Sequence, residues 1–176
     1  MSPRARSAAI IAAVVLLDRV TKWIIRTHVS GFDIIPVIPG FFNIVHTENP
    51  GAAFGVLSDW NFGGRSLLLI GVSLVVMIII GVMLWRTPAS LMSNLMNIGL
   101  SLVFGGALGN FWDRAFAGTV TDFLQFFFGS YEFPSFNAAD SAISIGAALL
   151  LIDLWRTRGK ETIAKKESGA RSQESE

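Results

Sequence analysis

The sequence is poor in charge and contains no cysteine. Only 15% of its 176 residues are Asp, Glu, Lys or Arg, against roughly 25% in ordinary soluble domains. The absence of cysteine excludes a disulfide framework, a thiolate nucleophile and a thiolate metal site. The formal net charge of +1 carries no information about partners, and the length predicts a single domain.

The distribution of the few charges is more informative than their number. Residues 66–85 and 87–112 contain no ionisable side chain. A bilayer core about 30 Å thick is crossed by about 20 helical residues, so both runs are long enough to span it. Together with a mean hydropathy of +0.55, this pattern predicts a membrane protein. It excludes a soluble globular domain, a disordered chain and a simple nucleic-acid binder.

Four apolar segments predict an all-α membrane protein with transmembrane helices over about 7–25, 66–85, 91–111 and 137–155. The first resembles a secretory signal, because Arg4 and Arg6 precede an apolar run, but it lacks a small-x-small cleavage site and is predicted to be retained. Residues 1–155 then form one membrane domain. Residues 156–176 show no apolar periodicity and are predicted to be a polar, disordered cytoplasmic tail.

The basic residues predict the orientation of these helices. If the helices alternate in direction, most basic side chains share one side of the membrane, which the positive-inside rule assigns to the cytoplasm. Both termini are therefore expected in the cytoplasm, and residues 27–64 and 113–136 on the outer face. The basic residues on the cytoplasmic side are Arg4, Arg6, Arg86, Arg156, Arg158, Lys160, Lys165, Lys166 and Arg171.

The outward loop over residues 27–64 is too long for a plain connection. Its segment IIPVIPGFFNIVHT has short apolar runs separated by prolines, which predicts short strands at the membrane surface. Asn49, Pro50 and Gly51 form a turn signal directly after it.

Polar residues inside membrane helices are costly and mark candidate functional positions. Asp18 and Lys22 stand four residues apart, the spacing at which an acid and a base pair on one helix face. The favoured interpretation is a neutralised pair that packs its helix against neighbours, because either charge alone is expensive to bury. A role in positioning substrate is the alternative.

The outward end of the third apolar segment carries a second polar group. Asn110 and Arg114 share a helix face, and Gly105 with Gly109 gives the GxxxG spacing that allows close helix approach. Asp113 and Arg114 are consistent with an ion pair that ends the helix. The Arg114 guanidinium is also suited to holding carboxylate or lipid oxygens at a membrane mouth.

Two further carboxylates are predicted at the outward membrane boundary. Asp122 is flanked by apolar and aromatic residues, and Asp140 lies in the first turn of the fourth apolar segment, three residues after Asn137. A carboxylate at a helix N-terminus complements the helix dipole, which is an ordinary explanation for Asp140. Two carboxylates sharing a desolvated site would have pKa values that split into an acid and a base, as in aspartic peptidases. The spacing alone leaves open whether they meet.

Other chemistries fit the residues less well. His28 and His46 are isolated and no HExxH motif is present, so no zinc site, and no other metal or cofactor, is predicted. No G-x-S-x-G elbow exists. A small transporter or channel is the main alternative, supported by Asp18, which lies fairly deep in its segment. A non-catalytic scaffold subunit would use the GxxxG face but has no need of two acids at one membrane face.

In combination, five sequence blocks resemble the lipoprotein signal peptidase (signal peptidase II) family, a bacterial membrane aspartic peptidase. The resemblance covers roughly residues 10–155. The blocks follow in the family's order: 18–22 (DRVTK), 47–54 (TENPGAAF), 109–114 (GNFWDR), 120–123 (VTDF) and 136–140 (FNAAD).

The resemblance implies a fold, a substrate and a set of site residues. The fold is a four-helix transmembrane bundle, with a small extracytoplasmic β-sheet and a short surface helix from the first loop. The substrate is a diacylglyceryl-modified prolipoprotein, cut just before the lipidated cysteine by an enzyme of the bacterial inner membrane. We expect membrane lipids and signal peptides as partners, no nucleic acid, no cofactor, and a monomer. Asp122 and Asp140 are the implied catalytic dyad, and the implied substrate-binding or supporting residues are Asp18, Lys22, Asn49, Gly51, Ala52, Asn110, Arg114, Asn137 and Ala138.

Overall fold

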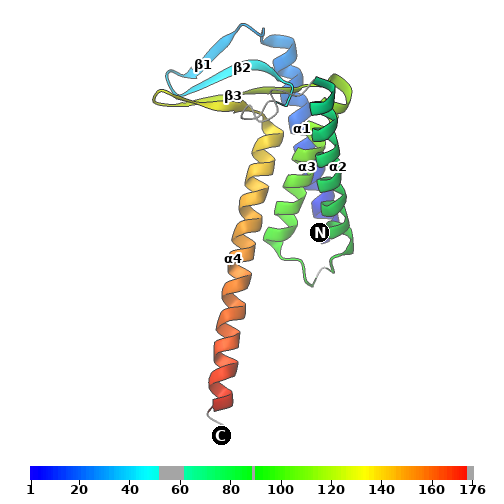
Figure 1. Cartoon of the computed structure of the whole chain (residues 1–176), viewed down its shortest axis with the longest axis vertical. Coiled ribbons are helices and arrows are strands. Elements are labelled where there is room, and N and C mark those ends of the chain that lie inside the picture. The colour runs from blue at the N-terminus through cyan, green and yellow to red at the C-terminus, as the bar shows by residue number, and fades with distance from the viewer. Residues whose placement is uncertain (52–61, 89, 174–176) are drawn as a thin grey trace.

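The computed structural model of the protein describes residues 1–51, 62–88 and 90–173. Helices α1 (Pro3–His28), α2 (Phe62–Arg86), α3 (Asn94–Ala117) and α4 (Ala138–Gln173) run roughly along one axis, and an antiparallel sheet covers one end of them (Figure 1). The helix α3 contacts each of the other three. The N-terminus and the C-terminus both lie at the end opposite the sheet (Figure 1).

Local sequence explains where the helices begin and end. Ser2 precedes Pro3 and its hydroxyl accepts a hydrogen bond from the Ala5 amide at 3.2 Å, and Ser93 caps α3 through the Met96 amide at 2.9 Å. At the end of α3, Gly118 adopts the left-handed conformation (φ +78°) that closes many helices.

Small residues allow α3 to pack closely against its neighbours. A Cβ on Gly105 would lie 2.9 Å from the Cβ of Val14 in α1, and one on Gly109 would lie 2.6 Å from Asp18 Oδ2. The prediction that this GxxxG pair permits close helix approach is therefore confirmed.

Three of the four helices are long and apolar enough to cross a membrane, over Ser66–Arg86, Asn94–Ala117 and Ala138–Thr157. In the described part of the chain α1 is not among them, because its second half carries Asp18, Arg19 and Lys22. Arg19 and Lys22 pair with Asp113 on α3, and Asp18 pairs with Lys22 on its own helix. The four predicted helices are present, and the crossing of the membrane by α1 stays a prediction.

The helix α4 is longer than the sequence predicted. It continues to Gln173, so the prediction of a tail without regular structure from residue 156 is wrong. The tail lacks an apolar face, but Ala, Glu, Lys and Arg are all good helix formers, and their propensity extends the membrane helix beyond its apolar part.

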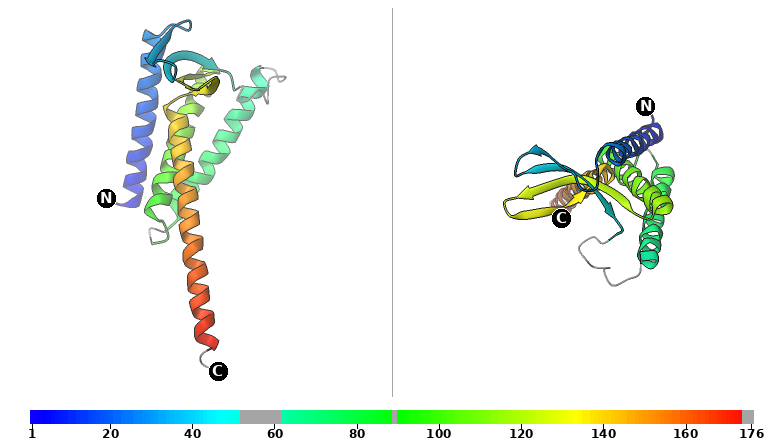
Figure 2. Two further views of the ribbon diagram at one scale, coloured as in Figure 1. Left: turned by 90° about the vertical axis from the view of Figure 1, so that its left-hand side faces the viewer. Right: turned by 90° about the horizontal axis from the view of Figure 1, so that it is seen from above.

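The sheet contains four strands in the order β1 (Ile34–Ile38), β2 (Phe42–Asn49), β3 (Val120–Phe128) and β4 (Tyr131–Phe136). The strands predicted in the first loop are confirmed as β1 and β2, whereas β3 and β4 were not predicted. The sheet lies over the start of α4 and projects away from α2 (Figure 2). The short surface helix expected from the first loop is not among the elements of residues 29–51, and residues 52–61 of that loop lie outside the described residues.

The pairing of β2 with β3 brings two distant segments together. Thr47 pairs with Asp122 and Asn49 with Val120. The first residues of the TENPGAAF block, Thr47 to Asn49 in β2, therefore lie beside the strand that carries Asp122.

Candidate active site

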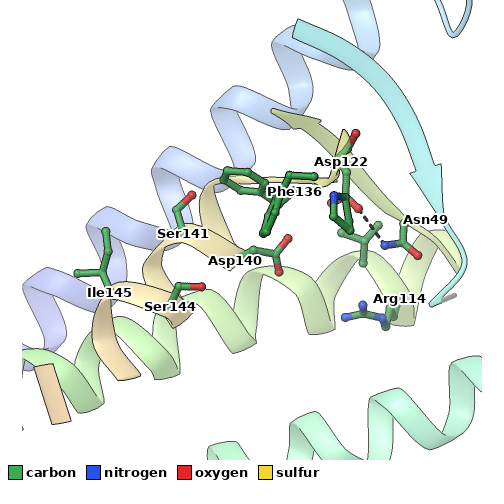
Figure 3. A pocket seen from close by; sticks show the side chains of 12 residues that line it. Asn49, Arg114, Asp122, Phe136, Asp140, Ser141, Ser144 and Ile145 are labelled. Atoms are coloured by element: carbon green, nitrogen blue, oxygen red, sulfur yellow. Dashed lines mark hydrogen bonds between the residues drawn. The ribbon is translucent and has the colours of Figure 1, made fainter. Parts of the chain in front are cut away.

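Asp122 and Asp140 line one cavity of about 560 Å³ where the sheet meets the helices (Figure 3). Asp122 comes from β3, and Asp140 lies in the first turn of α4. The rest of the lining is mixed, with polar, aromatic and aliphatic side chains. The remaining lining residues are Asn49, Arg114, Val120, Phe133, Pro134, Ser135, Phe136, Ser141, Ser144 and Ile145.

Two amide side chains hold the Asp122 carboxylate. Asn49 Nδ2 donates to Asp122 Oδ2 at 2.9 Å, and Asn137 Nδ2 donates to Oδ1 at 2.7 Å. The carboxylate is only 3% exposed. Burial, supplemented by the nearby charge of Asp140, raises the pKa of Asp122 to about 6, even though both hydrogen bonds act in the opposite direction.

Asp140 is fixed by the helix start and by α3. Its Oδ2 accepts a hydrogen bond from the Asn137 backbone amide at 3.2 Å, and its own amide donates to Asn137 Oδ1 at 3.0 Å. This reciprocal pair is a capping box, so the helix-terminal explanation for Asp140 holds in part. Its other oxygen, Oδ1, accepts from Asn110 Nδ2 at 2.7 Å.

Asn137 joins the two carboxylates. It is completely buried, and besides its bonds to Asp122 and Asp140 it donates to Asn110 Oδ1 at 3.2 Å. Asn137 thus contacts both acids and also Asn110, whose amide binds Asp140. Ala138, the first residue of α4, packs against the apolar cluster of Ile25, Val29 and Phe123 and fixes this helix end against α1 and β3.

The turn after β2 orients Asn49. The Gly51 amide donates to Asn49 Oδ1 at 2.8 Å, which leaves the Asn49 amino group facing Asp122. Gly51 has φ +93°, a conformation that residues with a Cβ rarely adopt. Gly51 therefore supports the site through the backbone. The predicted site residue Ala52 lies outside the described residues.

Arg114 lines the same cavity from α3. Its Nε is buried and has no hydrogen-bond partner among the described residues. A guanidinium with an unused donor beside two carboxylates is suited to binding an oxygen of an incoming ligand.

A buried ion cluster lies behind the site. Lys22 Nζ is 2.9 Å from Asp18 and 2.7 Å from Asp113 Oδ2, which confirms the predicted pairing of Asp18 with Lys22. Asp113 also binds Arg19, and Arg26 at 3.2 Å. All three of the residues Asp18, Lys22 and Asp113 are at most 1% exposed.

The ion pair between Asp113 and Arg114 that the sequence suggested is not among the ion pairs of the described residues. Asp113 instead faces the cations of α1, and α3 continues past it to Ala117. A helix turns by about 100° per residue, so adjacent side chains point in different directions and cannot both face the cavity.

Arg19 and Arg26 were missed by the sequence reasoning as members of the cluster around Asp113. Their spacing from Lys22, at positions 19, 22 and 26, places all three on one face of α1. Arg26 Nε also donates to Thr121 Oγ1 at 2.7 Å, next to Asp122 in β3. The shared face of these three cations could be predicted from the sequence, but their common partner on α3, Asp113, could not.

The fold and site together define a membrane protein with a pair of carboxylates enclosed at the sheet end of its helices. The model of the signal peptidase (SPase) II family matches residues 10–156. The chain belongs to this family and is a membrane peptidase.

Similar proteins agree with this assignment. The lipoprotein signal peptidase of Solibacter usitatus (strain Ellin6076) is 46% identical over 155 residues, covering 88% of this chain and 93% of the relative. That of Yersinia pseudotuberculosis serotype O:1b (strain IP 31758) is 42% identical over 146 residues, covering 80% of each.

Solved structures resemble the whole fold. A bacterial membrane enzyme determined by the in meso method at 2.3 Å has a TM-score of 0.77 and 36% identity, covering 89% of this chain and 91% of that one. A second, determined at 1.9 Å, has a TM-score of 0.74 and 38% identity, covering 85% and 92%.

Proposed function

We propose that the protein is an aspartic endopeptidase that removes the signal peptide from diacylglyceryl-modified bacterial prolipoproteins, cutting before the lipidated cysteine. The names of the similar lipoprotein signal peptidases support this substrate class. The observation that carries the proposal is the shared cavity of Asp122 and Asp140, whose carboxylates are both bound to Asn137. The two acids are the catalytic dyad of this proposal.

The proposed reaction uses a dyad that holds one proton. The ionised carboxylate takes a proton from a water molecule as its oxygen attacks the scissile carbonyl carbon, while the protonated carboxyl donates to the carbonyl oxygen. Collapse of the tetrahedral intermediate breaks the C–N bond, and the leaving nitrogen takes up a proton from the dyad. The products are the carboxyl terminus of the signal peptide and the free amine of the lipidated cysteine. The raised pKa of Asp122, about 6, supports a dyad that keeps one proton near neutral pH.

The surrounding side chains then act by orientation. Asn49, Asn110 and Asn137 direct amide donors at the two carboxylates, which fixes the direction in which each can meet water and carbonyl. Arg114 binds a substrate oxygen, from the peptide or from the ester of the diacylglyceryl group, through its unused Nε donor. The aromatic lining residues Phe133 and Phe136 contact apolar parts of the substrate in this proposal.

The proposed setting is the bacterial cytoplasmic membrane. The sheet end of the molecule is the extracytoplasmic face, and both termini are cytoplasmic. Two observations support this orientation. Both termini lie opposite the sheet (Figure 1), and most basic residues belong to the segments at that end of the molecule. A dyad at the outer surface of the bilayer can reach the scissile bond, because the acyl chains of the substrate hold that bond at the same depth. The chain acts as a monomer in this proposal.

The test uses purified protein in detergent and two synthetic prolipoprotein peptides that differ only in the diacylglyceryl group on cysteine. We expect mass spectrometry to find cleavage directly before the cysteine in the lipidated peptide and little in the other. Equal cleavage of both peptides, or a cut at another bond, would contradict the proposed substrate.

A further inference from the structure

Lys22 connects the buried ion cluster of α1 and α3 to the proposed dyad. Its Nζ lies 2.9 Å from Asp18, 2.7 Å from Asp113 and 3.0 Å from Asn110 Oδ1. An ammonium has three N–H bonds and no acceptor. Lys22 donates hydrogen bonds to Asp18 Oδ2 and Asn110 Oδ1, and its third partner, Asp113, lies at ion-pair distance. The two carboxylates neutralise its charge, whereas Asn110 is an amide that contacts Asp140.

The two ends of the Asn110 amide make opposite kinds of contact. Its Oδ1 accepts from Lys22 and, at 3.2 Å, from Asn137, and its Nδ2 donates to Asp140 Oδ1 at 2.7 Å. If the amide turned by 180°, its Nδ2 would face the Lys22 ammonium and its oxygen would face the Asp140 carboxylate. Both contacts would then be repulsive. Lys22 therefore favours, together with Asn137 and Asp140, the orientation in which the Asn110 amino group faces the acid.

We propose that Lys22 is a positioning residue for the reaction, acting through Asn110 to keep a hydrogen-bond donor on Asp140. The inference rests on the proposed function of the dyad. It differs from the interpretation of Asp18 and Lys22 as a packing pair, which needs only the contact between Lys22 and the two carboxylates. The contact between Lys22 and Asn110 is not needed to neutralise Lys22, because Asp18 and Asp113 already supply two negative charges.

The proposal predicts a change in pH dependence that requires Asn110. The charge of Lys22 by itself acts to lower the pKa of Asp122, so only the part of a shift that Asn110→Ala abolishes reports on the contact between Lys22 and Asn110. Asp140 shares its cavity with Asp122 from β3 and Arg114 from α3, and Lys22 acts on it through Asn110. A donated hydrogen bond favours the ionised carboxylate, so its loss disfavours ionisation. The acid limb of the kcat/KM profile should move to higher pH by about one unit, the effect of one hydrogen bond to a charged group.

The experiment is a double-mutant cycle of Lys22→Met and Asn110→Ala, with kcat/KM measured across pH on the lipidated peptide. We expect Lys22→Met to lower kcat/KM about tenfold in the wild-type chain and by less than about twofold when Asn110 is already Ala. Equal losses in both backgrounds would overturn the proposal, because Lys22 would then act independently of Asn110. An unshifted acid limb in Lys22→Met would overturn it as well.

The same cycle is measured a second time with Asp18→Asn present, because Lys22→Met alone leaves two buried carboxylates with one cation fewer. In that background Asp113 keeps Arg19 and Arg26 as its cations, so we expect the variant without Lys22 to fold. Coupling between Lys22 and Asn110 is expected there too, and additive losses there contradict the proposal even where Lys22→Met alone fails to fold.

Arg19→Met is the matched control. In the described part of the chain Arg19 forms ion pairs with Asp18 and Asp113, the carboxylates that Lys22 also binds. We expect it to lower thermal stability without moving the acid limb. A shift equal to that of Lys22→Met would assign the effect to the cluster as a whole and contradict the role of Lys22. Failure of the proposed function is distinguishable, because the parent chain would then not cleave the lipidated peptide.

Discussion

Asn137 and Asp140 exchange two hydrogen bonds at the start of α4, one in each direction between side chain and backbone. The same two side chains also reach into the proposed site, where Asn137 Nδ2 binds Asp122 and Asp140 Oδ1 binds Asn110. The beginning of one helix and the geometry of the dyad are therefore set by the same residues.

Two substitutions at Asn137 separate these roles. Serine caps helices about as well as asparagine but lacks the amide donors, whereas alanine lacks both. We expect Asn137→Ser to be about 1 kcal/mol more stable than Asn137→Ala. Both should lose activity about equally, by at least tenfold, because neither donates to Asp122 as the amide does. Thermal unfolding in detergent and peptide cleavage measure the two effects. An active Asn137→Ser enzyme would show that capping is the only contribution of this residue.

The raised pKa of Asp122 makes stability depend on pH. Its pKa is about 6 in the folded protein and 3.8 in an unperturbed chain, so the folded state binds more protons between these values. The contribution of Asp122 to stability is therefore fully present below about pH 4 and is lost as pH rises through about 6. The uncharged Asp122→Asn should lack this loss, so its stability relative to wild type should rise by roughly 2 kcal/mol from pH 4 to pH 7. Unfolding measured at both pH values checks the sign; a constant difference would mean that burial does not penalise this carboxylate.

Asp113 is expected to matter for folding more than for chemistry. It is 1% exposed and binds Arg19, Lys22 and Arg26. Removing it leaves cations without their shared partner, and Asp113→Asn should lower stability by roughly 3 kcal/mol or more. The protein that remains folded should cleave within about tenfold of wild type, since Asp113 contacts neither dyad carboxylate in the described structure. Complete loss of activity in folded Asp113→Asn would place this acid in the reaction instead.

Much of this could be predicted from the sequence, because the strongest patterns are local. Apolar segments predicted all four helices, two of them through runs without any charge, and the proline-separated run before Asn49 predicted β1 and β2. The hairpin of β3 and β4 was missed although its signal is visible: aromatic and β-branched residues flank Gly129 and Ser130.

The ion cluster shows what the sequence could not predict. The pairing of Asp18 with Lys22 follows from their spacing on one helix. The choice of Asp113 as the partner of three α1 cations depends on the rotation of α3 against α1, which no local pattern specifies. Asn110 likewise has an evident place on α3, but its contact with Lys22 appears only when the two helices are packed.

Close packing of α3 against α4 predicts a sharp contrast between two glycines. A Cβ on Gly106 would meet the backbone oxygen of Ala139, which cannot move without displacing the helix start that carries Asp140. Gly71 on α2 has nothing within 4 Å of such a Cβ. Gly106→Ala should destabilise the protein by roughly 2 kcal/mol or more, through overpacking. Gly71→Ala should be neutral or slightly stabilising. Comparable thermal stability of the two variants would contradict the observed approach of the helices.

The central claim is that Asp122 and Asp140 act together as the catalytic dyad. Its most direct test is the rate of cleavage of the lipidated peptide by Asp122→Asn and Asp140→Asn, each purified and shown to be folded by thermal unfolding in detergent. We predict that each substitution lowers kcat at least about 1,000-fold, because neither single carboxylate can supply both the acid and the base. Near wild-type cleavage by either folded variant would contradict the assignment.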